Sequence, residues 1–536
     1  MGAIVIKSVM VTTFLGTLNN RTCFRLLTLG ILLAASVSCK TVAIKREIRS
    51  TGEIASVGKE NRYIKAHMYD GTVYIMHGWN FSQHENQLTG SGKHLDINRR
   101  LIEERGVGMT GQTVSPFFTV PVDDIAIIET NDPGPSVVGG LAVVTGVTAG
   151  FAVFCLINPK ACFGSCPTFY AFNGDSLVLM AEGFSESVSP SLEDNDIDML
   201  YHAVPQKTMN LRLTNEALET HVIRYANLLI AEKNGDERVF ATPGGGFLLT
   251  DNIVSPEDCR VSGISCLDKV LFPDGVDYFS EADPDDLNTK EELLLNFRNP
   301  GPGNTGLIIG KRQTLLTTYL MYQGLSYMGH SVSYWMAEIE RGNLKPETTI
   351  FDLLGSIEIY RKTSDGGWAY EGEVHETGPI ATDFNIVPLS VGNGEDVEMK
   401  LVMNKGLWRV NYLALASVIG EVEPVVIRPH AVKRIKGDEE QPLDKLLDEH
   451  DHLVTYPGDI YDLSYELPFE NAELFLDSRG YYLEWIRDEW VEEQSLRNFR
   501  LMVRNPERYL KTAAKKFKEI EPLMEETFWN SRYVEK

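Results

Sequence analysis

Residues 162–184 read Cys-Phe-Gly-Ser-Cys-Pro-Thr-Phe-Tyr-Ala-Phe-Asn-Gly-Asp-Ser-Leu-Val-Leu-Met-Ala-Glu-Gly-Phe and open the longest β-like part of the chain. Residues 169–172 and 177–180 are two short strand candidates. Residues 173–175, Asn-Gly-Asp, supply the positive-φ positions that a tight hairpin needs. Pro167 cannot donate to a ladder, so it suits the first position of a strand. Because a charge-free apolar run precedes this stretch, the sequence predicts a hairpin immediately outside a membrane.

Length and charge bound the class of protein. The 536 residues are enough for about three or four domains, each with its own core. The apolar fraction of 43% is that of a globular chain. The chain has 50 basic and 75 acidic residues, a net charge of −25, which would repel a polyanion. Nucleic acid is therefore not an expected partner, and the charge can equally serve solubility alone.

The cysteine spacing suggests local disulfides. Cys162 and Cys166 form one close pair, and Cys259 and Cys266 form another. Either disulfide would need an oxidising compartment, and buried thiols are the alternative for all four. The spacings C-x₃-C and C-x₆-C match no standard zinc pattern, so no metal site is expected. The chain contains seven cysteines, Cys23, Cys39, Cys155, Cys162, Cys166, Cys259 and Cys266.

Residues 1–39 have the pattern of a signal or lipoprotein-type leader. Two arginines precede a short apolar run at 26–35, and residues 36–38 form a small-x-small cleavage site. Cys39 follows that site directly, as in bacterial lipoproteins, which makes it a candidate lipid attachment site. The usual lipoprotein pattern has Leu where this chain has Ser36. Cleavage without a lipid, or an uncleaved anchor, remains the alternative.

Residues 40–133 are predicted to form a small β module. Residues 63–69 and 73–77 alternate around an Asp-Gly-Thr turn, which is a hairpin signal.

The leader at 1–39 is long enough that either Met1 or Met10 could be the start of translation.

The segment 134–158 is Gly-rich, apolar and free of charged residues. Its length suffices for a helix across the hydrocarbon layer of a membrane. Gly146 and Gly150 form a G-x₃-G step, and Gly139 lies on a similar face, so two such helices could approach closely in lipid. The sequence therefore predicts a candidate membrane helix of the glycine-zipper type. A buried helix in a soluble core is the alternative.

The rest of the chain alternates between β-like and helical patterns. Residues 159–280 read as a β-rich domain, 281–345 as a helical insertion, 346–430 as a second β-rich unit, and 440–536 as an α-helical C-terminal region. The two β units carry similar strand, turn and strand segments, as two sandwich halves would. The predicted fold class is thus α+β and multi-domain, with a small N-terminal β module, an apolar helix and a β-sandwich-like body.

Three motif-like stretches are not predicted as sites. The acidic run that begins at Asp194 starts like a calcium loop, but Met199 takes the required glycine position. Residues 329–333 resemble a nucleophile elbow, but Ser333 replaces the second glycine. His450 and His452 lack a third placed ligand. We therefore predict no catalytic residue, metal or cofactor.

Two segments resemble a known family. Residues 166–174, Cys-Pro-Thr-Phe-Tyr-Ala-Phe-Asn-Gly, and residues 480–485, Gly-Tyr-Tyr-Leu-Glu-Trp, resemble segments of large bacterial predicted lipoproteins of uncharacterised function. The resemblance implies placement in the cell envelope. It carries over no catalytic residue.

These observations favour an extracytoplasmic protein anchored at the membrane, with a non-catalytic role in binding or assembly and a protein or glycan partner. The alternative is an extracytoplasmic carboxylate-dependent hydrolase acting on glycans, which needs two acids about 5 to 10 Å apart. A component of secretion machinery is a third possibility. Candidate acids are Glu371, Glu373, Glu376 and Asp383.

Overall fold

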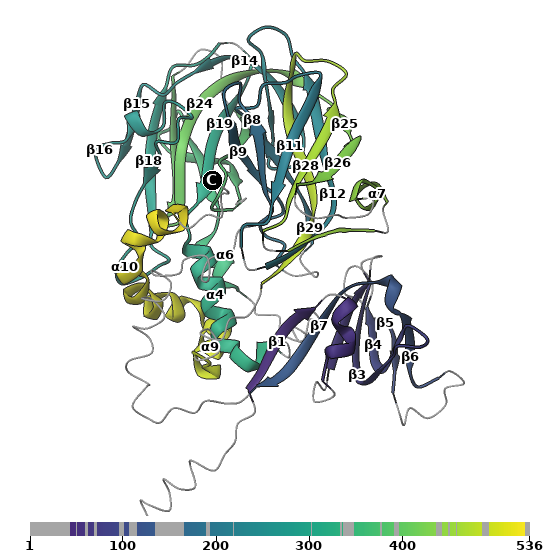
Figure 1. The fold of residues 1–536 in the computed structure, drawn as a ribbon. Coiled ribbons are helices and arrows are strands. Elements are labelled where there is room, and N and C mark those ends of the chain that lie inside the picture. Colours follow the sequence, from purple (N-terminus) through teal and green to yellow (C-terminus); the bar gives the residue numbers. More distant parts are fainter. Residues whose placement is uncertain are drawn as a thin grey trace, which may run out of the picture.

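The computed structural model is mostly β-sheet (Figure 1). Among the described residues, strands account for 49% and helices for 19%, so the protein is predominantly β. The structure describes residues 43–49, 51–58, 63–68, 72–95, 101–106, 115–134, 166–188, 193–217, 219–301, 303–332, 335, 348–375, 378–390, 396–435, 442–448, 451–456, 458–484 and 493–530.

The N-terminal unit is one antiparallel sheet, here called sheet A, with strand order β1-β7-β2-β3-β4-β5 and β6 beside β4. It packs its own small core, which includes Ile64, Met76 and Leu88. Its elements are β1 (Ala43–Arg49), η1 (Thr51–Ser56), β2 (Tyr63–Met68), β3 (Val73–Ser82), β4 (Gln87–Leu95), β5 (Leu101–Arg105), β6 (Phe118–Pro121), η2 (Val122–Asp124) and β7 (Ile125–Gly134).

The first half of the body contains two sheets that share a core. Sheet B has the order β26-β28-β11-β8-β9, and sheet C the order β10-β29-β12-β25 with β27 beside β12. The strands of sheet B are β8 (Thr168–Phe172), β9 (Leu177–Glu182), β11 (Thr208–Thr214), β26 (Ala431–Arg434) and β28 (Ile460–Glu466). Those of sheet C are β10 (Asp194–Met199), β12 (Glu219–Glu232), β25 (Val425–Ile427), β27 (Leu453–Thr455) and β29 (Ala472–Glu484).

The second half repeats this arrangement with sheets D and E. Sheet D has the order β14-β13-β22-β19-β24-β17 and curls until β14 also pairs with β24, and sheet E has the order β16-β15-β18-β23-β20-β21. The strands of sheet D are β13 (Arg238–Ala241), β14 (Phe247–Val254), β17 (Tyr278–Phe279), β19 (Asn304–Gln313), β22 (Asp383–Leu389) and β24 (Trp408–Glu421). Those of sheet E are β15 (Asp258–Val261), β16 (Ile264–Ser265), β18 (Lys290–Phe297), β20 (Ile357–Lys362), β21 (Trp368–Val374) and β23 (Val397–Asn404).

Sheets C and D are buried on both faces. Along β12, Leu228 packs in the core shared with sheet B, while Leu229 packs in the core shared with sheet D. Along β19, Ile308 faces sheet C and Ile309 faces sheet E. Because side chains alternate between the two faces of a strand, a sheet that contacts two partners needs apolar residues at successive positions. The runs in β12, β19 and β24 satisfy that requirement.

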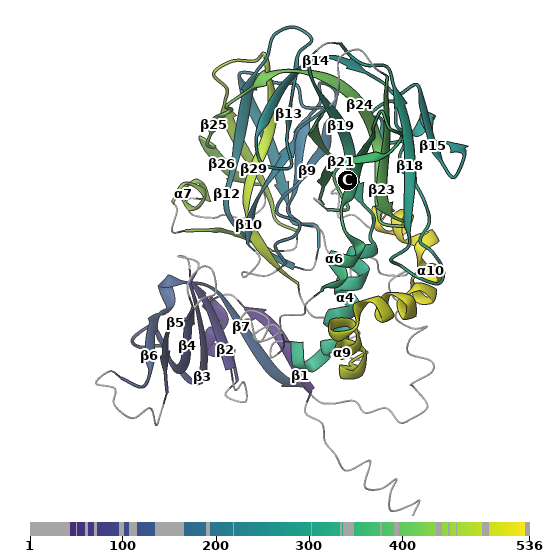
Figure 2. The ribbon, with the colours of Figure 1, turned by 180° about the vertical axis from the view of Figure 1, so that it is seen from behind.

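Most of the helices lie at one end of sheets D and E and extend toward sheet A (Figures 1 and 2), but the short helix α7 lies beside β12 and β26. They add Leu316, Phe499 and Phe517 to the core of sheets D and E, and η6 contacts β1 of sheet A. The helices are η5 (Leu267–Lys269), α4 (Leu316–Met328), η6 (Gly329–Ser331), α6 (Ile350–Leu354), α7 (Pro442–Leu447), α9 (Leu496–Arg504) and α10 (Pro506–Asn530).

The predicted α+β class is therefore wrong, and two regions explain the error. The expected helical insertion at 281–345 contains β18 and β19, and its first α-helix begins only at Leu316. The expected α-helical region at 440–536 contains β27, β28 and the long β29 before α9 and α10. A strand that is buried on both faces loses the period-2 pattern, so sequence periodicity does not separate it from a buried helix.

The membrane prediction falls largely outside the described residues. Gly134 ends β7 and pairs with Ala43 of β1, whereas Gly139, Gly146 and Gly150 are not among the described residues, nor is Cys39. Of the helices that the structure describes, none combines the length and the apolar character needed to cross a bilayer.

The predicted hairpin is confirmed. Strands β8 and β9 pair with Phe172 opposite Leu177. Asn173 Oδ1 accepts hydrogen bonds from the backbone N–H groups of Asp175 at 3.0 Å and Ser176 at 2.9 Å. Gly174 has φ +106, which favours glycine.

Candidate functional site

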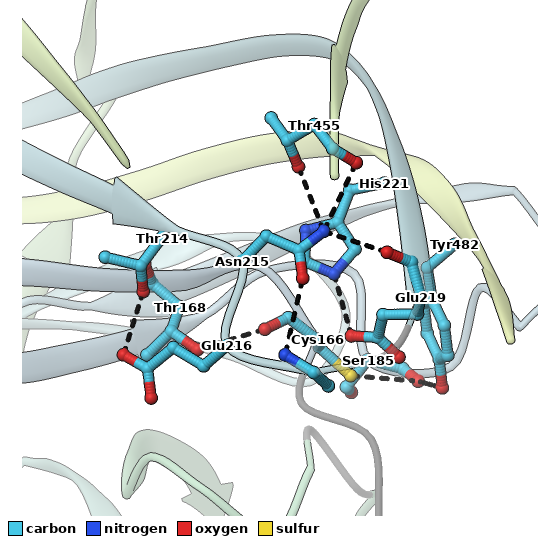
Figure 3. Close-up of polar contacts among 11 residues, drawn as sticks. Cys166, Thr168, Ser185, Thr214, Asn215, Glu216, Glu219, His221, Thr455 and Tyr482 are labelled. Atoms are coloured by element: carbon cyan, nitrogen blue, oxygen red, sulfur yellow. Dashed lines mark hydrogen bonds and ion pairs between the residues drawn. The ribbon is translucent and has the colours of Figure 1, made fainter. Parts of the chain in front are cut away.

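A buried polar group surrounds Cys166 at one end of sheets B and C (Figure 3). Cys166 precedes β8, and its Sγ lies 3.8 Å from the carbonyl oxygen of Ser185. Tyr482, from the end of β29, donates to the same oxygen at 3.1 Å. Cys166 is a free, buried thiol, so the predicted pair with Cys162 is not formed. Cys162 lies outside the described residues.

The same group holds a buried acid and imidazole pair. Glu219 and His221 are fully buried at the start of β12, with 2.7 Å between Glu219 Oε1 and His221 Nε2. Asn215 donates to the carbonyl oxygens of Glu219 at 3.0 Å and Thr455 at 3.2 Å, which fixes the turn between β11 and β12. Figure 3 shows how the side chains of Asn215, Glu219, His221 and Thr455 point toward one another.

Burial, followed by the charges of Glu182 and Glu219, raises the pKa of the Cys166 thiol. A nucleophilic cysteine needs a lowered pKa and access to substrate. Cys166 has neither property, so this group fits a structural role.

Next to Cys166 lie four acids that we call the carboxyl cluster: Glu182 at the end of β9, Asp196 and Asp198 on β10, and Asp383 at the start of β22. Glu182, Asp198 and Asp383 are at most 2% exposed. Fully buried Lys311 donates from Nζ to Asp383 Oδ2 at 2.8 Å. Three sheets, B, C and D, thus bring their acids to one place.

The surroundings oppose ionisation of these acids. Burial raises the pKa of Glu182 to about 7 against the hydrogen bonds that it accepts. Burial, then Asp383 and Glu182, raises the pKa of Asp196 to about 8. Burial, then Asp196 and Asp383, also raises the pKa of Asp198. Within the described parts of the chain, no group of three or more His, Cys, Asp or Glu side chains is arranged to hold a metal ion.

A cavity of about 270 Å³ lies where α10 covers sheet D, and Arg409, Phe517 and Glu525 contribute to its lining. Arg312 Nη2 lies 2.6 Å from Glu525 Oε1, and Arg409 Nε lies 3.3 Å from the same oxygen. The guanidinium of Arg409 also stacks over the ring of Phe279, 4.4 Å from its centroid. These ion pairs fasten α10 to strands β19 and β24.

The outer face of sheet E carries an exposed group that we call the aromatic face: Tyr360 on β20, and Trp368 and Tyr370 on β21. Tyr370 is 55% exposed and Trp368 38%. Tyr360 pairs directly with Tyr370 across the two strands, and their rings meet edge to face with centroids 5.6 Å apart. The alternation that buries Ile357 and Ile359 in the core places these rings on the opposite side.

Charged side chains surround the aromatic face. Lys400 of β23 lies 5.3 Å from the ring centroid of Tyr360 and 5.1 Å from that of Trp368, and donates to Glu292 at 2.9 Å. Glu358 accepts from the Tyr360 hydroxyl at 2.5 Å, and this hydrogen bond raises the pKa of Tyr360 to about 12. The rings are thereby held in place, with the ammonium group of Lys400 over two of them and Glu358 at the hydroxyl of Tyr360.

The four candidate acids named in the sequence analysis do not lie in one common site. The side chain of Glu371 is 3% exposed and pairs with Arg361, and Asp383 belongs to the carboxyl cluster. Glu373 lies beside the aromatic face, directly opposite Glu358, and accepts from Ser356 at 2.6 Å. Glu376 lies outside the described residues.

Among the other predicted positions, Cys259 and Cys266 form a disulfide, which is the pair that their spacing predicts. The aromatic face and the carboxyl cluster were missed. Exposed aromatic residues two positions apart on a strand, at 368 and 370, were the available signal for the aromatic face.

Comparisons with known proteins add no family. No protein-family model matches the chain, and a search of curated proteins finds no match. Among solved structures, the chain is similar to the secreted serine protease VesC from Vibrio cholerae at 7% identity, with 71% of this chain and 76% of that chain covered and a TM-score of 0.14.

A GH31 alpha-xylosidase from Xanthomonas citri is similar at 8% identity, with 79% of this chain and 38% of that chain covered and a TM-score of 0.14. A chain of Sulfolobus Turreted Icosahedral Virus is similar at 9% identity, with 60% and 100% covered and a TM-score of 0.11. At such TM-scores, none of these likenesses supports an argument about fold or function.

Proposed function

We propose that this chain is a non-catalytic binding protein of the cell envelope that binds a glycan on the aromatic face of sheet E. The observation that carries the proposal is the group of Tyr360, Trp368 and Tyr370 on one exposed sheet face. Its placement in the envelope rests on the leader at 1–39, on Cys39 as a lipid site, and on the resemblance of two segments to envelope lipoproteins.

The chemistry of the aromatic face suits a sugar chain. Aromatic rings offer flat, apolar surfaces against which the C–H faces of sugar rings can pack, and exposed aromatic groups often mark binding sites. Glu358 lies at the hydroxyl edge of Tyr360, and the ammonium group of Lys400 lies over the Tyr360 and Trp368 rings, so sugar hydroxyl groups near the rings would find an acceptor and a donor. Trp368 and Tyr370 are both exposed, so a polymer can reach their rings.

Binding to insoluble polysaccharides tests the proposal. The purified protein is incubated with peptidoglycan sacculi, chitin and cellulose, and the bound fraction is measured after sedimentation. At least one polymer should retain the wild-type protein. Trp368→Ala and Tyr370→Ala should each weaken that binding by about tenfold, the effect of losing one good aromatic contact.

Phe272→Ala is the matched control, because Phe272 is 64% exposed and lies in the loop before β17, outside strands β20 and β21. It should bind as the wild type does. Retention of no polymer, or equal loss of binding in the Phe272 and Trp368 variants, would refute a glycan site on this face.

One observation favours a second candidate, the carboxylate-dependent hydrolase. Glu358 and Glu373 stand directly opposite each other beside the aromatic rings. Directly opposed residues have Cβ atoms roughly 4.5 to 5.5 Å apart, which allows the carboxyl separation of a glycosidase. If this candidate is correct, the wild type releases reducing sugar from the polymer that it binds. Glu358→Gln and Glu373→Gln would then abolish release and keep binding.

A further inference from the structure

The carboxyl cluster gathers four acids beside one lysine, so in the part of the chain that the structure describes the charges of most of its carboxylates are not neutralised by a bonded cation. Lys311 is fully buried and commits its ammonium group to Asp383 Oδ2 at 2.8 Å and Asn385 Oδ1 at 2.7 Å. Glu182, Asp196 and Asp198 have no such bonded cation among the described residues. Three ionised carboxylates in this interior would each cost several kcal/mol.

Within the described parts of the structure, each acid of the carboxyl cluster has a buried oxygen without a hydrogen-bond partner. Asp198 is 2% exposed, and its Oδ2 has no hydrogen-bond partner. Glu182 Oε1, Asp196 Oδ2 and Asp383 Oδ1 are also buried without partners. A carboxyl group in such surroundings avoids the desolvation cost by binding a proton. Asp198 thus has a buried oxygen without a hydrogen-bond partner, and the charges of Asp196, Asp383 and Glu182 act on it.

The cluster also lies at a joint between the two halves of the body. Glu182 of sheet B accepts from the backbone N–H groups of Ile380 at 2.7 Å and Ala381 at 3.4 Å, just before β22 of sheet D. A Cβ on Gly378 would lie 2.3 Å from Glu182 Oε2, so this loop closes tightly over the carboxyl group. Strand β10 of sheet C contacts both β9 and β22.

We propose that the carboxyl cluster is a proton-operated latch, which holds sheets B and C against sheet D when its acids are protonated and loosens this joint when they ionise. Several other groups face the acids from neighbouring elements. Lys311 and Arg312 of β19 oppose loosening, because their positive charges favour the ionised acids. Glu186, in the turn after β9, favours loosening, because its negative charge repels the ionised form of Asp196. The thiol of Cys166 borders Glu182.

The direction in which stability changes with pH follows from the raised pKa values of Glu182 and Asp196. The pKa is about 7 for Glu182 and about 8 for Asp196 in the folded protein, against about 4 for unfolded Glu and Asp. The folded state therefore holds more protons than the unfolded state between these limits. The stability contributed by the latch is complete below pH 4 and is lost as the pH rises through 7 to 8.

Urea unfolding of the full chain at pH 5.5, 7 and 8.5 tests the latch. Each proton taken up on folding changes the folding equilibrium constant by about tenfold per pH unit. The wild type should lose stability across this range. Asp198→Asn removes one acid with little change of shape, so it should flatten the pH dependence and be more stable than the wild type at pH 8.5. Asp236→Asn, in an exposed turn, should keep the wild-type slope.

Hydrogen exchange locates the loosening. At pH 8.5, amides of β10 and of residues 378–383 should lose protection before those of β12 and β24, after correction for the intrinsic base dependence of exchange. Wild-type stability that is flat or rises from pH 5.5 to 8.5 would overturn the latch, even if Asp198→Asn fails to fold. So would restoration of stability at pH 8.5 by calcium that a chelator reverses, since that would identify a cation site.

Discussion

Glu525 shows how one buried acid can behave in the opposite way to the carboxyl cluster. Burial by itself raises its pKa, but Arg312 and Arg409 outweigh burial and hold the pKa of Glu525 below its ordinary value. The two guanidinium groups lie on neighbouring strands of sheet D and bind the same oxygen of Glu525. This acid is therefore ionised in the folded protein and joins α10 to the sheet.

Glu525→Gln should destabilise the protein by about 2 kcal/mol at pH 7, because it removes one of the two carboxylates, Glu525 and Asp277, that both arginines share. Since the folded pKa is lowered, the contribution of Glu525 is present above the unfolded pKa near 4 and disappears as the pH falls through the folded value. Urea unfolding of both proteins at pH 7 and pH 3 measures the difference, which should shrink at pH 3.

Glu281→Gln provides a matched control for that experiment. Glu281 is 73% exposed and pairs with Lys518 near the same cavity, so its loss should have little effect. An equal cost of Glu525→Gln at both pH values would contradict the assigned ionisation.

The cysteines show how far spacing predicts chemistry at this scale. Cys259 and Cys266 are joined because β15 and β16 form a short hairpin that returns the chain on itself. Cys166 precedes β8 and points its thiol toward Ser185 and Tyr482. Sequence separation predicted the Cys162–Cys166 and Cys259–Cys266 disulfides equally. The direction of the strands beside each cysteine decides which of the two disulfides forms.

At the scale of elements, the strands of sheets C and D differ from ordinary amphipathic strands, since their neighbouring residues belong to different cores. Ile308 and Ile309 are both fully buried, one facing sheet C and the other facing sheet E. In β18 of sheet E, by contrast, Leu294 is 44% exposed and Leu295 is 1% exposed.

Ile308→Ala and Ile309→Ala should each cost about 2 to 5 kcal/mol of stability, the range for truncating a buried aliphatic side chain. In β18, Leu295→Ala should cost a similar amount and Leu294→Ala less than about 1 kcal/mol. Urea midpoints of the four variants measure this. A small cost for either isoleucine would contradict the two-sided burial of β19.

This arrangement also explains which elements the sequence predicted correctly. The β8–β9 hairpin was predicted because its turn residues and strand lengths are local properties. Strands β18 and β19 were mistaken for part of a helical insertion, since their role depends on sheets formed by distant residues. The helical insertion predicted at 281–345 does contain α4, which ends at Met328.

At the scale of the whole molecule, contacts between distant parts of the chain dominate. Strand β12 pairs with β29, more than 200 residues later, over nearly its full length. Sheet A contacts the body through η6, and the ring of His67 lies 6.3 Å from that of Tyr481. The body is therefore a single assembly of four sheets, because each of its neighbouring sheets shares a core with the next.

Placement in the cell is a prediction about the whole molecule that depends on the leader. If Cys39 carries a lipid, the wild type should sediment with membranes and incorporate an acyl label in its native cell. Cys39→Ser should lose the label and leave the membrane fraction, while Cys23→Ser should change neither. Recovery of the unlabelled wild type in the soluble cytoplasmic fraction would rule out this placement.

Residues close together in the chain determined the β8–β9 hairpin, the Cys259–Cys266 pair and the leader-like pattern, because turn chemistry, spacing and local polarity act over a few positions. The carboxyl cluster and the two-sided burial of sheets C and D depend on register between strands far apart in the chain, such as Asp198 opposite Leu476. That register arises from packing four sheets together, so only the tertiary structure brings these side chains into one place.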